Sequence, residues 1–235
     1  MPDEVLVQLR AVTKDYRGLR PLRIESLELR AGRSMALLGF DQAMAEVLVD
    51  LITGAILPDS GDITAFGRPT TDIADPDSWL STLDQFGLLT DRAVLVEHFT
   101  VAQNLAVPLS LAVEDMPRQI RDRVGELASE VGLAGELDLQ TGATSPSTRA
   151  RIRLGRALAL GPRVLLGEHP NATLSRDDAG AFAADLSRIV ASRRLASLVL
   201  TADGDFARAV AEDVLVLKPA TGVLEPWSRW RRWFS

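Results

Sequence analysis

Cysteine is absent from the 235 residues of this chain, which excludes both disulfides and thiolate-ligated metal sites. Lysine is nearly absent, because Lys14 and Lys218 are the only two, so a site that needs a lysine has almost no candidate. Long apolar runs are also missing: residues 35–38 and 198–200 fall far short of the roughly 20 residues that span a bilayer. The polar start, residues 1–10, does not resemble a signal peptide. We therefore expect a cytoplasmic protein.

A surplus of positive charge is missing as well, because the formal net charge is −6. A nucleic-acid partner needs a basic face to neutralise its phosphates, so we expect no such partner. The chain instead has the composition of a soluble globular protein, with 46% hydrophobic and 25% charged residues. Its length suffices for one α/β domain, or for a core with a small subdomain.

Hydrophobic patterning predicts strands and helices that alternate along most of the chain. Strand-like segments cover residues 5–9, 22–29, 34–38, 63–66, 164–166, 197–201 and 214–217. Helical patterns cover residues 43–52, 101–111, 118–131, 149–160 and 177–192. The first two strands alternate as antiparallel strands do, and the later alternation of strands with helices predicts a parallel sheet. The helical block from about 100 to 159 predicts a subdomain inserted into that sheet.

Several short motifs follow one another in an order and at spacings typical of one known family. They are Tyr16, Gly54, Pro58-Asp59-Ser60-Gly61, Gly67, Thr100-Val101-Ala102-Gln103-Asn104, Pro108-Leu109, Arg156-Ala157-Leu158, Pro162 and Val164-Leu165-Leu166. Together they resemble the nucleotide-binding domain of ABC transporters over about residues 7–222.

This resemblance implies an α/β fold: a P-loop NTPase-like (RecA-like) core with N-terminal antiparallel strands and an inserted helical subdomain. It divides the chain into a first part of the core with the P-loop (1–95), the helical subdomain with the signature (96–160), a second part of the core (161–225) and a Trp- and Arg-rich tail (226–235). The family's ligands are ATP and Mg²⁺, and the resemblance gives Tyr16 the role of stacking on adenine.

The P-loop of the family wraps phosphates with glycine N–H groups, neutralises them with a lysine and holds Mg²⁺ with a hydroxyl. Gly39 is retained here. The following positions read Gln42 and Met44 for glycines, Ala45 for the lysine, and Glu46 and Val47 for the two hydroxyl residues. A carboxylate beside the phosphates and a missing cation both disfavour ATP.

The other catalytic positions are changed as well. By spacing, the Walker B carboxylates correspond to Glu168 and His169, the Q-loop glutamine to Asp91, the H-loop histidine to Ala202 and the D-loop aspartate to Ser175. The signature Leu-Ser-Gly-Gly-Gln corresponds to residues 144–148, where Ser145 is kept and Pro146 and Ser147 replace the glycines. Pro146 has no N–H to offer a phosphate.

These changes predict a degenerate pseudo-ATPase, which is not an enzyme, has no catalytic residues, binds no metal and needs neither ATP nor Mg²⁺. The alternative is that the chain is an enzyme with repurposed chemistry, in which His169 acts as a base near neutral pH beside Glu168.

Helix starts that bind no phosphate need other partners for their N–H groups. We expect Asp41 to cap the helix after Gly39, with the Glu46 carboxylate in its first turns. Ser145 followed by Pro146 is typical of an N-cap and a first helical residue.

The tail, residues 226–235, carries three of the four tryptophans beside three arginines. Its docking candidates are Trp227, Trp230, Arg231, Trp233 and Phe234. On a helix, Trp227, Trp230 and Phe234 lie on one face. Such a face suits a membrane-embedded partner or the bilayer surface, and the alternative is packing on its own domain.

The resemblance implies a subunit with a structural role, peripheral on the inner face of the cell membrane. Its partners would be a transmembrane permease, docked along residues 86–109 with Asp91 and Phe99, and a second copy or a homologous ATPase in a head-to-tail dimer. One alternative is the regulatory half of a heterodimer, which senses an active homologue's ATP through Ser145. Another is a soluble ABC-like protein that has no connection with membranes.

Overall fold

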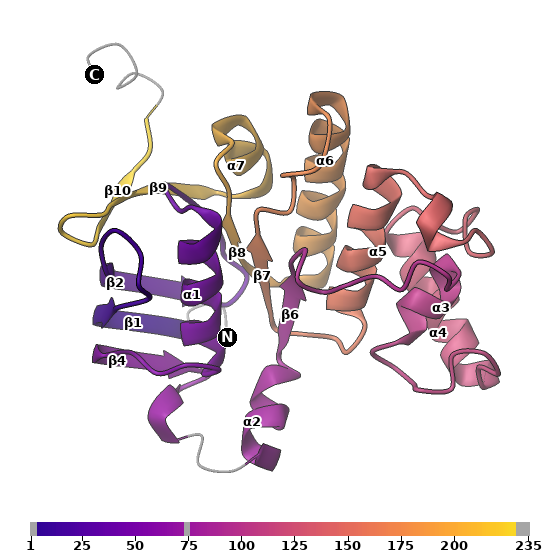
Figure 1. Ribbon diagram of the computed structural model, residues 1–235, viewed down its shortest axis with the longest axis horizontal. Helices are drawn as coiled ribbons and strands as arrows, with labels where there is room; N and C mark the ends of the chain where they lie inside the picture. The colour runs from indigo at the N-terminus through magenta and orange to yellow at the C-terminus, as the bar shows by residue number, and fades with distance from the viewer. Residues whose placement is uncertain (1–3, 73–75, 229–235) are drawn as a thin grey trace.

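The computed structural model describes residues 4–72 and 76–228 as two β-sheets with helices around them (Figure 1). The strands are β1 Val5–Lys14, β2 Leu22–Arg30, β3 Ser34–Leu38, β4 Ser60–Ala65, β5 Arg68–Pro69, β6 Phe86–Leu89, β7 Val164–Glu168, β8 Ala196–Leu200, β9 Asp213–Lys218 and β10 Val223–Pro226. The helices are α1 Gln42–Thr53, α2 Pro76–Leu83, α3 Val101–Ala106, α4 Arg118–Glu130, α5 Pro146–Leu158, α6 Arg176–Arg193 and α7 Gly204–Val210, with 3₁₀ turns η1 Thr70–Asp72 and η2 Thr141–Ala143.

The two sheets differ in strand direction. One has the order β2-β1-β4-β5 and is antiparallel. The other has the order β10-β9-β3-β8-β7-β6, in which the five strands from β9 to β6 are parallel and β10 is an antiparallel edge strand. Parallel neighbours joined through helices are typical of an α/β core. The predicted RecA-like class is therefore confirmed.

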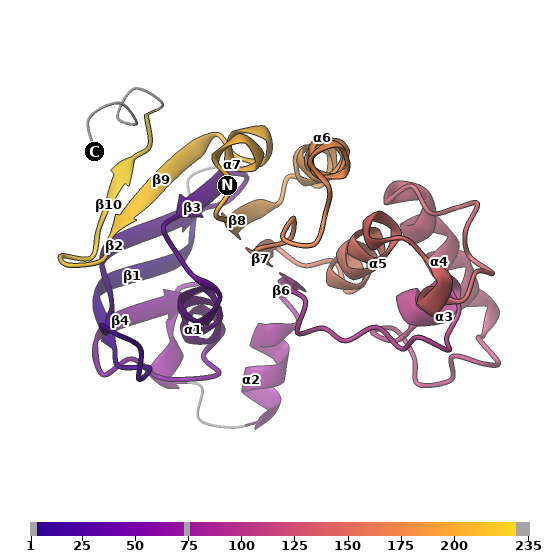
Figure 2. The same ribbon diagram turned by 45° about the horizontal axis from the view of Figure 1, so that its top comes forward.

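Both faces of the parallel sheet are covered, so β7 and β8 are buried along their whole lengths. On one side, α1 and the antiparallel sheet share a cluster of buried side chains with the sheet. On the other side, α6 and the helices α3, α4 and α5 share a second cluster (Figure 2). Strands covered on both faces read as unbroken apolar runs, which explains why this part of the sheet is visible in the sequence.

The helical subdomain, here α3 to α5, is joined to α6 of the core by ion pairs. Arg151 of α5 bonds to Asp185, and Arg193 bonds to Glu130 of α4. The Arg188 guanidinium also donates to the Glu130 carbonyl at 3.1 Å. These contacts fix α4 and α5 against one side of α6.

Some elements differ from the sequence prediction. The helix predicted over residues 101–111 ends at Ala106, because Pro108 has no N–H to continue the hydrogen-bond ladder. The prediction also omitted α2, β6 and α7, which are short. Within residues 4–72 and 76–228, no helix is both long and apolar enough to cross a membrane. The predicted boundaries at residues 95, 160 and 225 remain predictions.

Candidate functional site

The candidate site lies at the carboxyl edge of the parallel sheet, where ligands of open α/β folds bind. Gly39 follows β3 with a left-handed φ of 89°, which suits a residue without a Cβ. Glu168 ends β7, and Ala202 follows β8. Because these three strands are parallel neighbours, the structure brings together the predicted P-loop, Walker B and H-loop positions.

The start of α1 is satisfied from within the chain. The Asp41 carboxylate accepts a hydrogen bond of 2.8 Å from the Met44 N–H, which confirms Asp41 as the N-cap. Glu46 lies beyond the first turn and accepts from the Gln42 side chain at 3.0 Å. Glu46 therefore lies within the first two turns of α1, as expected, although one position past the first turn.

Ala45 and Val47 lie on the inner side of α1. Ala45 is fully buried in the cluster between the sheets, and Val47 packs against the same cluster. The positions where the family has its lysine and a hydroxyl residue therefore contribute apolar contacts here.

Tyr16 lies beside this helix start, half-buried against the same cluster. Burial raises the pKa of its phenol, and the nearby Asp41 carboxylate raises it further. Tyr16, the residue predicted to stack on adenine, therefore lies beside the start of the P-loop helix α1.

The Glu168 carboxylate is only 2% exposed and is bound by its neighbours. The Thr90 hydroxyl donates to Glu168 Oε2 at 2.6 Å, and Arg92 Nε donates to the same oxygen at 3.0 Å. Arg92 Nη2 bonds to the other carboxylate oxygen, and Arg92 Nη1 reaches Asp50 Oδ1 of α1 at 3.1 Å. The hydrogen bond to Glu168 raises the pKa of Arg92 above its usual value, against the opposing effect of partial burial.

The sequence prediction missed the contribution of Arg92, Thr90 and Asp50. Arg92 directly follows the Q-loop position Asp91, and this adjacency was the one available signal. Its acceptors lie 76 and 42 residues away along the chain, so no local pattern shows that they meet.

His169 has a strained backbone with φ of 44°, and its N–H donates to the Leu200 carbonyl at 2.8 Å. Its buried Nε2 has no hydrogen-bond partner among the described residues. His169 lines a cavity of about 730 Å³ with the turn after β8 and the start of α6. Since Glu168 is bound to Arg92 and Thr90, the geometry does not join the two as a catalytic pair.

The turn after β8 is ordered by hydrogen bonds around Ala202. The Thr201 hydroxyl donates to the Asn171 side chain at 2.9 Å, and Asp203 N–H donates to that hydroxyl at 3.1 Å. Asp203 caps α7 by accepting from Asp205 N–H at 2.8 Å. Ala202 itself is exposed.

The segment between β6 and α3 is held by arginines of α5. Arg153 Nη1 lies 3.1 Å from Asp91 Oδ1, and Arg156 Nη1 donates to the Val94 carbonyl at 2.8 Å. Burial, followed by the charge of Arg153, lowers the pKa of Arg156. Phe99 is half-buried at the far end of this segment.

The signature helix begins as predicted. Ser145 is the N-cap of α5 and accepts from Thr148 N–H at 3.1 Å, and Pro146 is the first helical residue. Ser147 is half-buried beside them. The Thr148 hydroxyl donates to Glu136 at 3.0 Å, so polar groups of this chain satisfy the helix start.

Of the tail, Trp227 is the docking candidate that the structure describes. Its ring lies 4.8 Å from the Arg208 guanidinium of α7 and touches Gly204. Trp227 therefore packs on its own domain, which is the alternative stated for the tail. The other candidates, Trp230, Arg231, Trp233 and Phe234, lie outside the described residues.

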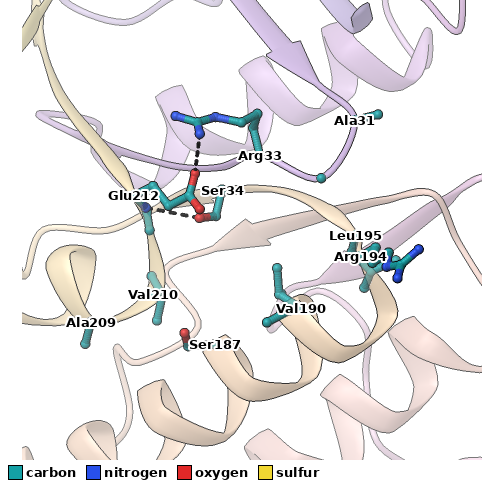
Figure 3. Close-up of a pocket in the computed structure, with 13 residues that line it drawn as sticks. Ala31, Arg33, Ser34, Ser187, Val190, Arg194, Leu195, Ala209, Val210 and Glu212 are labelled. Atoms are coloured by element: carbon teal, nitrogen blue, oxygen red, sulfur yellow. Dashed lines mark hydrogen bonds and ion pairs between the residues drawn. The ribbon is translucent and has the colours of Figure 1, made fainter. Parts of the chain in front are cut away.

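A larger cavity, of about 940 Å³, lies at the opposite edge of the sheet, where β3 begins (Figure 3). Its polar groups bind one another. Arg33 contacts Glu212 at 2.8 Å and Asp213 at 3.0 Å, and the Ser34 hydroxyl accepts from Glu212 N–H at 3.0 Å. The cavity is therefore separate from the P-loop edge.

Comparison with solved structures shows where this fold occurs. CbiO1 from Clostridium perfringens, described as part of the ABC transporter complex CbiONQ, superposes with a TM-score of 0.80 at 20% identity, covering 94% of this chain and 87% of that one. The ATP-binding cassette MJ0796, solved as a dimer bound to ADP and Pi, gives 0.77 at 20% identity, covering 94% and 98%. At this identity the likeness shows the fold alone.

Sequence relatives are ATP-binding subunits of import systems. The methionine import ATP-binding protein MetN of Brucella abortus is 29% identical over 213 residues, which cover 90% of this chain and 57% of MetN. The sulfate/thiosulfate import ATP-binding protein CysA of Thermosynechococcus vestitus is 30% identical over 213 residues, covering 90% and 61%. The chain thus spans about three fifths of the length of these relatives.

Two predictions from the sequence are overturned by these findings. The prediction that the chain is not an enzyme is wrong, because its relatives are ATP-binding subunits of a family that hydrolyses ATP. The prediction that it needs neither ATP nor Mg²⁺ is wrong for the same reason, and a cassette of the same fold holds ADP and Pi. Both rested on missing side chains, and the absence of familiar groups does not establish what a protein does.

The residues present do not fit Mg-ATP in the manner of the usual P-loop. Between Gly39 and Val47 there is neither a lysine nor a hydroxyl residue. At the end of β7, Arg92 and Thr90 already bind both Glu168 oxygens. No step of hydrolysis therefore follows from this arrangement.

The family of this chain is shown by the match of its sequence to a protein-family model. The model described as ABC transporter matches residues 22–172, which is well over half of the chain and includes the P-loop, the signature and the end of β7. Together with the fold, this match shows that the chain belongs to the ABC transporter family.

Proposed function

We propose that this chain is the cassette subunit of a membrane import complex, with a structural role at the inner face of the cell membrane. It would hold the transmembrane permease and set the geometry of the complex. In this assignment residues 1–95 and 161–225 form the core, 96–160 the helical subdomain and 226–235 the tail. The import systems named for MetN and CysA support this class of complex.

The observation that carries the proposal is the exposed segment between β6 and α3, which crosses from the core to the helical subdomain (Figure 2). Val94 is 74% exposed in this segment, and Leu111, beyond α3, is 98% exposed. We propose that these two apolar side chains lie in the contact with the permease. Arg156 donates a hydrogen bond to the Val94 carbonyl, so the backbone at Val94 is fixed and its side chain has a defined position.

A second copy of the chain, or a homologous ATPase, is proposed as the partner in a head-to-tail dimer. The dimeric cassette of the same fold supports this arrangement. The second candidate function is a regulatory half paired with an active homologue. It is favoured by Ser145, which is exposed at the start of α5, where it could face a partner.

The test is affinity purification of the tagged chain from membranes of its own cells. We expect a protein with several membrane spans to co-purify, and Val94→Asp to abolish this by placing a charge in the contact. Leu160→Asp is the matched control, because Leu160 is also exposed but lies just beyond the end of α5. Co-purification of a homologous ATPase would favour the regulatory candidate. A chain that remains in the soluble fraction and elutes alone would refute both.

A further inference from the structure

We infer that Arg92 is a built-in cation that locks the segment between β6 and α3 onto the core. We call Arg92 with its three acceptor-side partners, Asp50, Thr90 and Glu168, the Arg92 clamp. The inference concerns this chain alone and does not depend on the proposed permease partner.

The inner side of the clamp is anchored in two elements of the core. Arg92 donates from Nε and Nη2 to the two Glu168 oxygens at the end of β7, and from Nη1 to Asp50 in α1. This fork geometry is what a guanidinium offers and an ammonium does not. Because Glu168 is buried, its charge needs a partner, and Arg92 is the cation within reach among the described residues.

The outer side of the same segment is anchored in the helical subdomain. Arg153 of α5 pairs with Asp91, and Arg156 donates to the Val94 carbonyl. Arg92 N–H donates to the Thr90 hydroxyl at 3.1 Å, and Val94 N–H donates to the Arg92 carbonyl at 2.9 Å, so the intervening turn is closed as well. Within this segment, Thr90 and Arg92 are thus tied to the core, and Asp91 and Val94 are tied to α5.

This arrangement has a consequence for any ligand at the carboxyl edge of the sheet. A metal ion or other cation that binds Glu168 must first displace Arg92 and leave the guanidinium with Asp50 alone. Displacement leaves Asp50 of α1 as the one partner of the clamp that still holds the Arg92 side chain to the core. The clamp therefore couples the occupancy of Glu168 to the position of the surface that carries Val94.

Hydrogen–deuterium exchange on the purified chain tests the clamp. We expect Arg92→Ala to speed exchange of the amides of residues 92–94 about ten-fold or more, because charge-assisted hydrogen bonds are lost. Exchange in α4 stays unchanged. Arg118→Ala is the matched control, since the Arg118 side chain is 92% exposed and its one ion pair among the described residues is with Asp122 at 3.8 Å. Equal exchange at residues 92–94 in both variants would overturn the inference.

Two further variants keep the test decisive if Arg92→Ala does not fold. Arg92→Lys keeps the charge but loses the fork, so exchange at residues 92–94 rises by a smaller factor. A double-mutant cycle of Arg92→Lys with Glu168→Gln measures the coupling directly through the unfolding midpoint. We expect the double variant to be less destabilised than the sum of the two single variants. Additive effects would mean that the two residues act separately, and the clamp would be rejected.

Discussion

Removing the cap of α1 gives the most direct test of how the P-loop edge is stabilised. Asp41→Ala removes the acceptor 2.8 Å from Met44 N–H and leaves an orphan donor in the first turn. Losing such a cap costs about 1 kcal/mol, within a range of about 0.5–2. In a chain of this size, that amount lowers the melting temperature by about 2–4 °C.

The assay is thermal unfolding followed by circular dichroism, with no nucleotide present. Glu46→Ala is the matched control, because in the part of the chain that the structure describes Glu46 bonds only to the exposed Gln42 side chain. We expect this variant to shift the melting temperature by under about 1 °C. Asp41→Asn keeps a capping oxygen and should recover most of the loss. If Asp41→Ala melts at the same temperature as Glu46→Ala, the helix start does not depend on its own carboxylate and the reasoning fails.

Three further predictions follow from single contacts. Tyr16 is the only tyrosine, so its absorbance titration is unambiguous, and Asp41→Asn should lower its pKa part of the way towards 10, because burial persists; an unchanged titration would contradict this. For Asp185, burial raises the pKa but the hydrogen bonds from two arginines outweigh it, so its folded pKa lies below the ordinary 3.8. Its stabilisation is therefore present above pH 3.8 and is lost as the pH falls through the folded pKa, so Asp185→Asn should lower the unfolding midpoint at pH 7 more than at pH 3. Phe182→Ala empties a fully buried position stacked 6.4 Å from Phe206 and should cost about 3–5 kcal/mol in urea unfolding; a loss under about 1 kcal/mol would show that the core collapses to fill the space.

At the start of α1 and at the end of β7, a charged side chain of this protein compensates a charge or dipole of opposite sign. Asp41 supplies an anion where α1 begins, and Arg92 supplies a cation where β7 ends. A helix start and a buried carboxylate each need a partner of opposite character, and both partners here are side chains of the chain itself. At these two places, the charge is therefore compensated by residues of the chain itself.

The prediction that the chain is not an enzyme was inferred from missing catalytic residues alone, and it was wrong. Ala45 in α1 and Ala202 after β8 both lie at the carboxyl edge of the sheet. Their identity records which groups are absent. That the relatives bind ATP, and that a cassette of the same fold holds ADP and Pi, is known from the comparison with those proteins.

The sequence by itself determined the features that depend on neighbouring residues. The strands β7 and β8 follow from short, unbroken apolar runs. Asp41 and Ser145-Pro146 follow from the needs of a helix start one turn away. The spacing between Gly39 and Gly54 kept the turn, the helix and its C-cap recognisable.

Only the tertiary structure decided which distant side chains meet. Arg92 reaches Glu168 across 76 residues, and Arg153 reaches Asp91 across 62, because parallel strand order brings β6 beside β7 and packs α5 against β6. Trp227 packs on α7 for a similar reason, since β10 returns it to the start of β9. A charged or aromatic side chain has many possible partners along a sequence. The free energy of the packed fold as a whole selects the partner that it contacts.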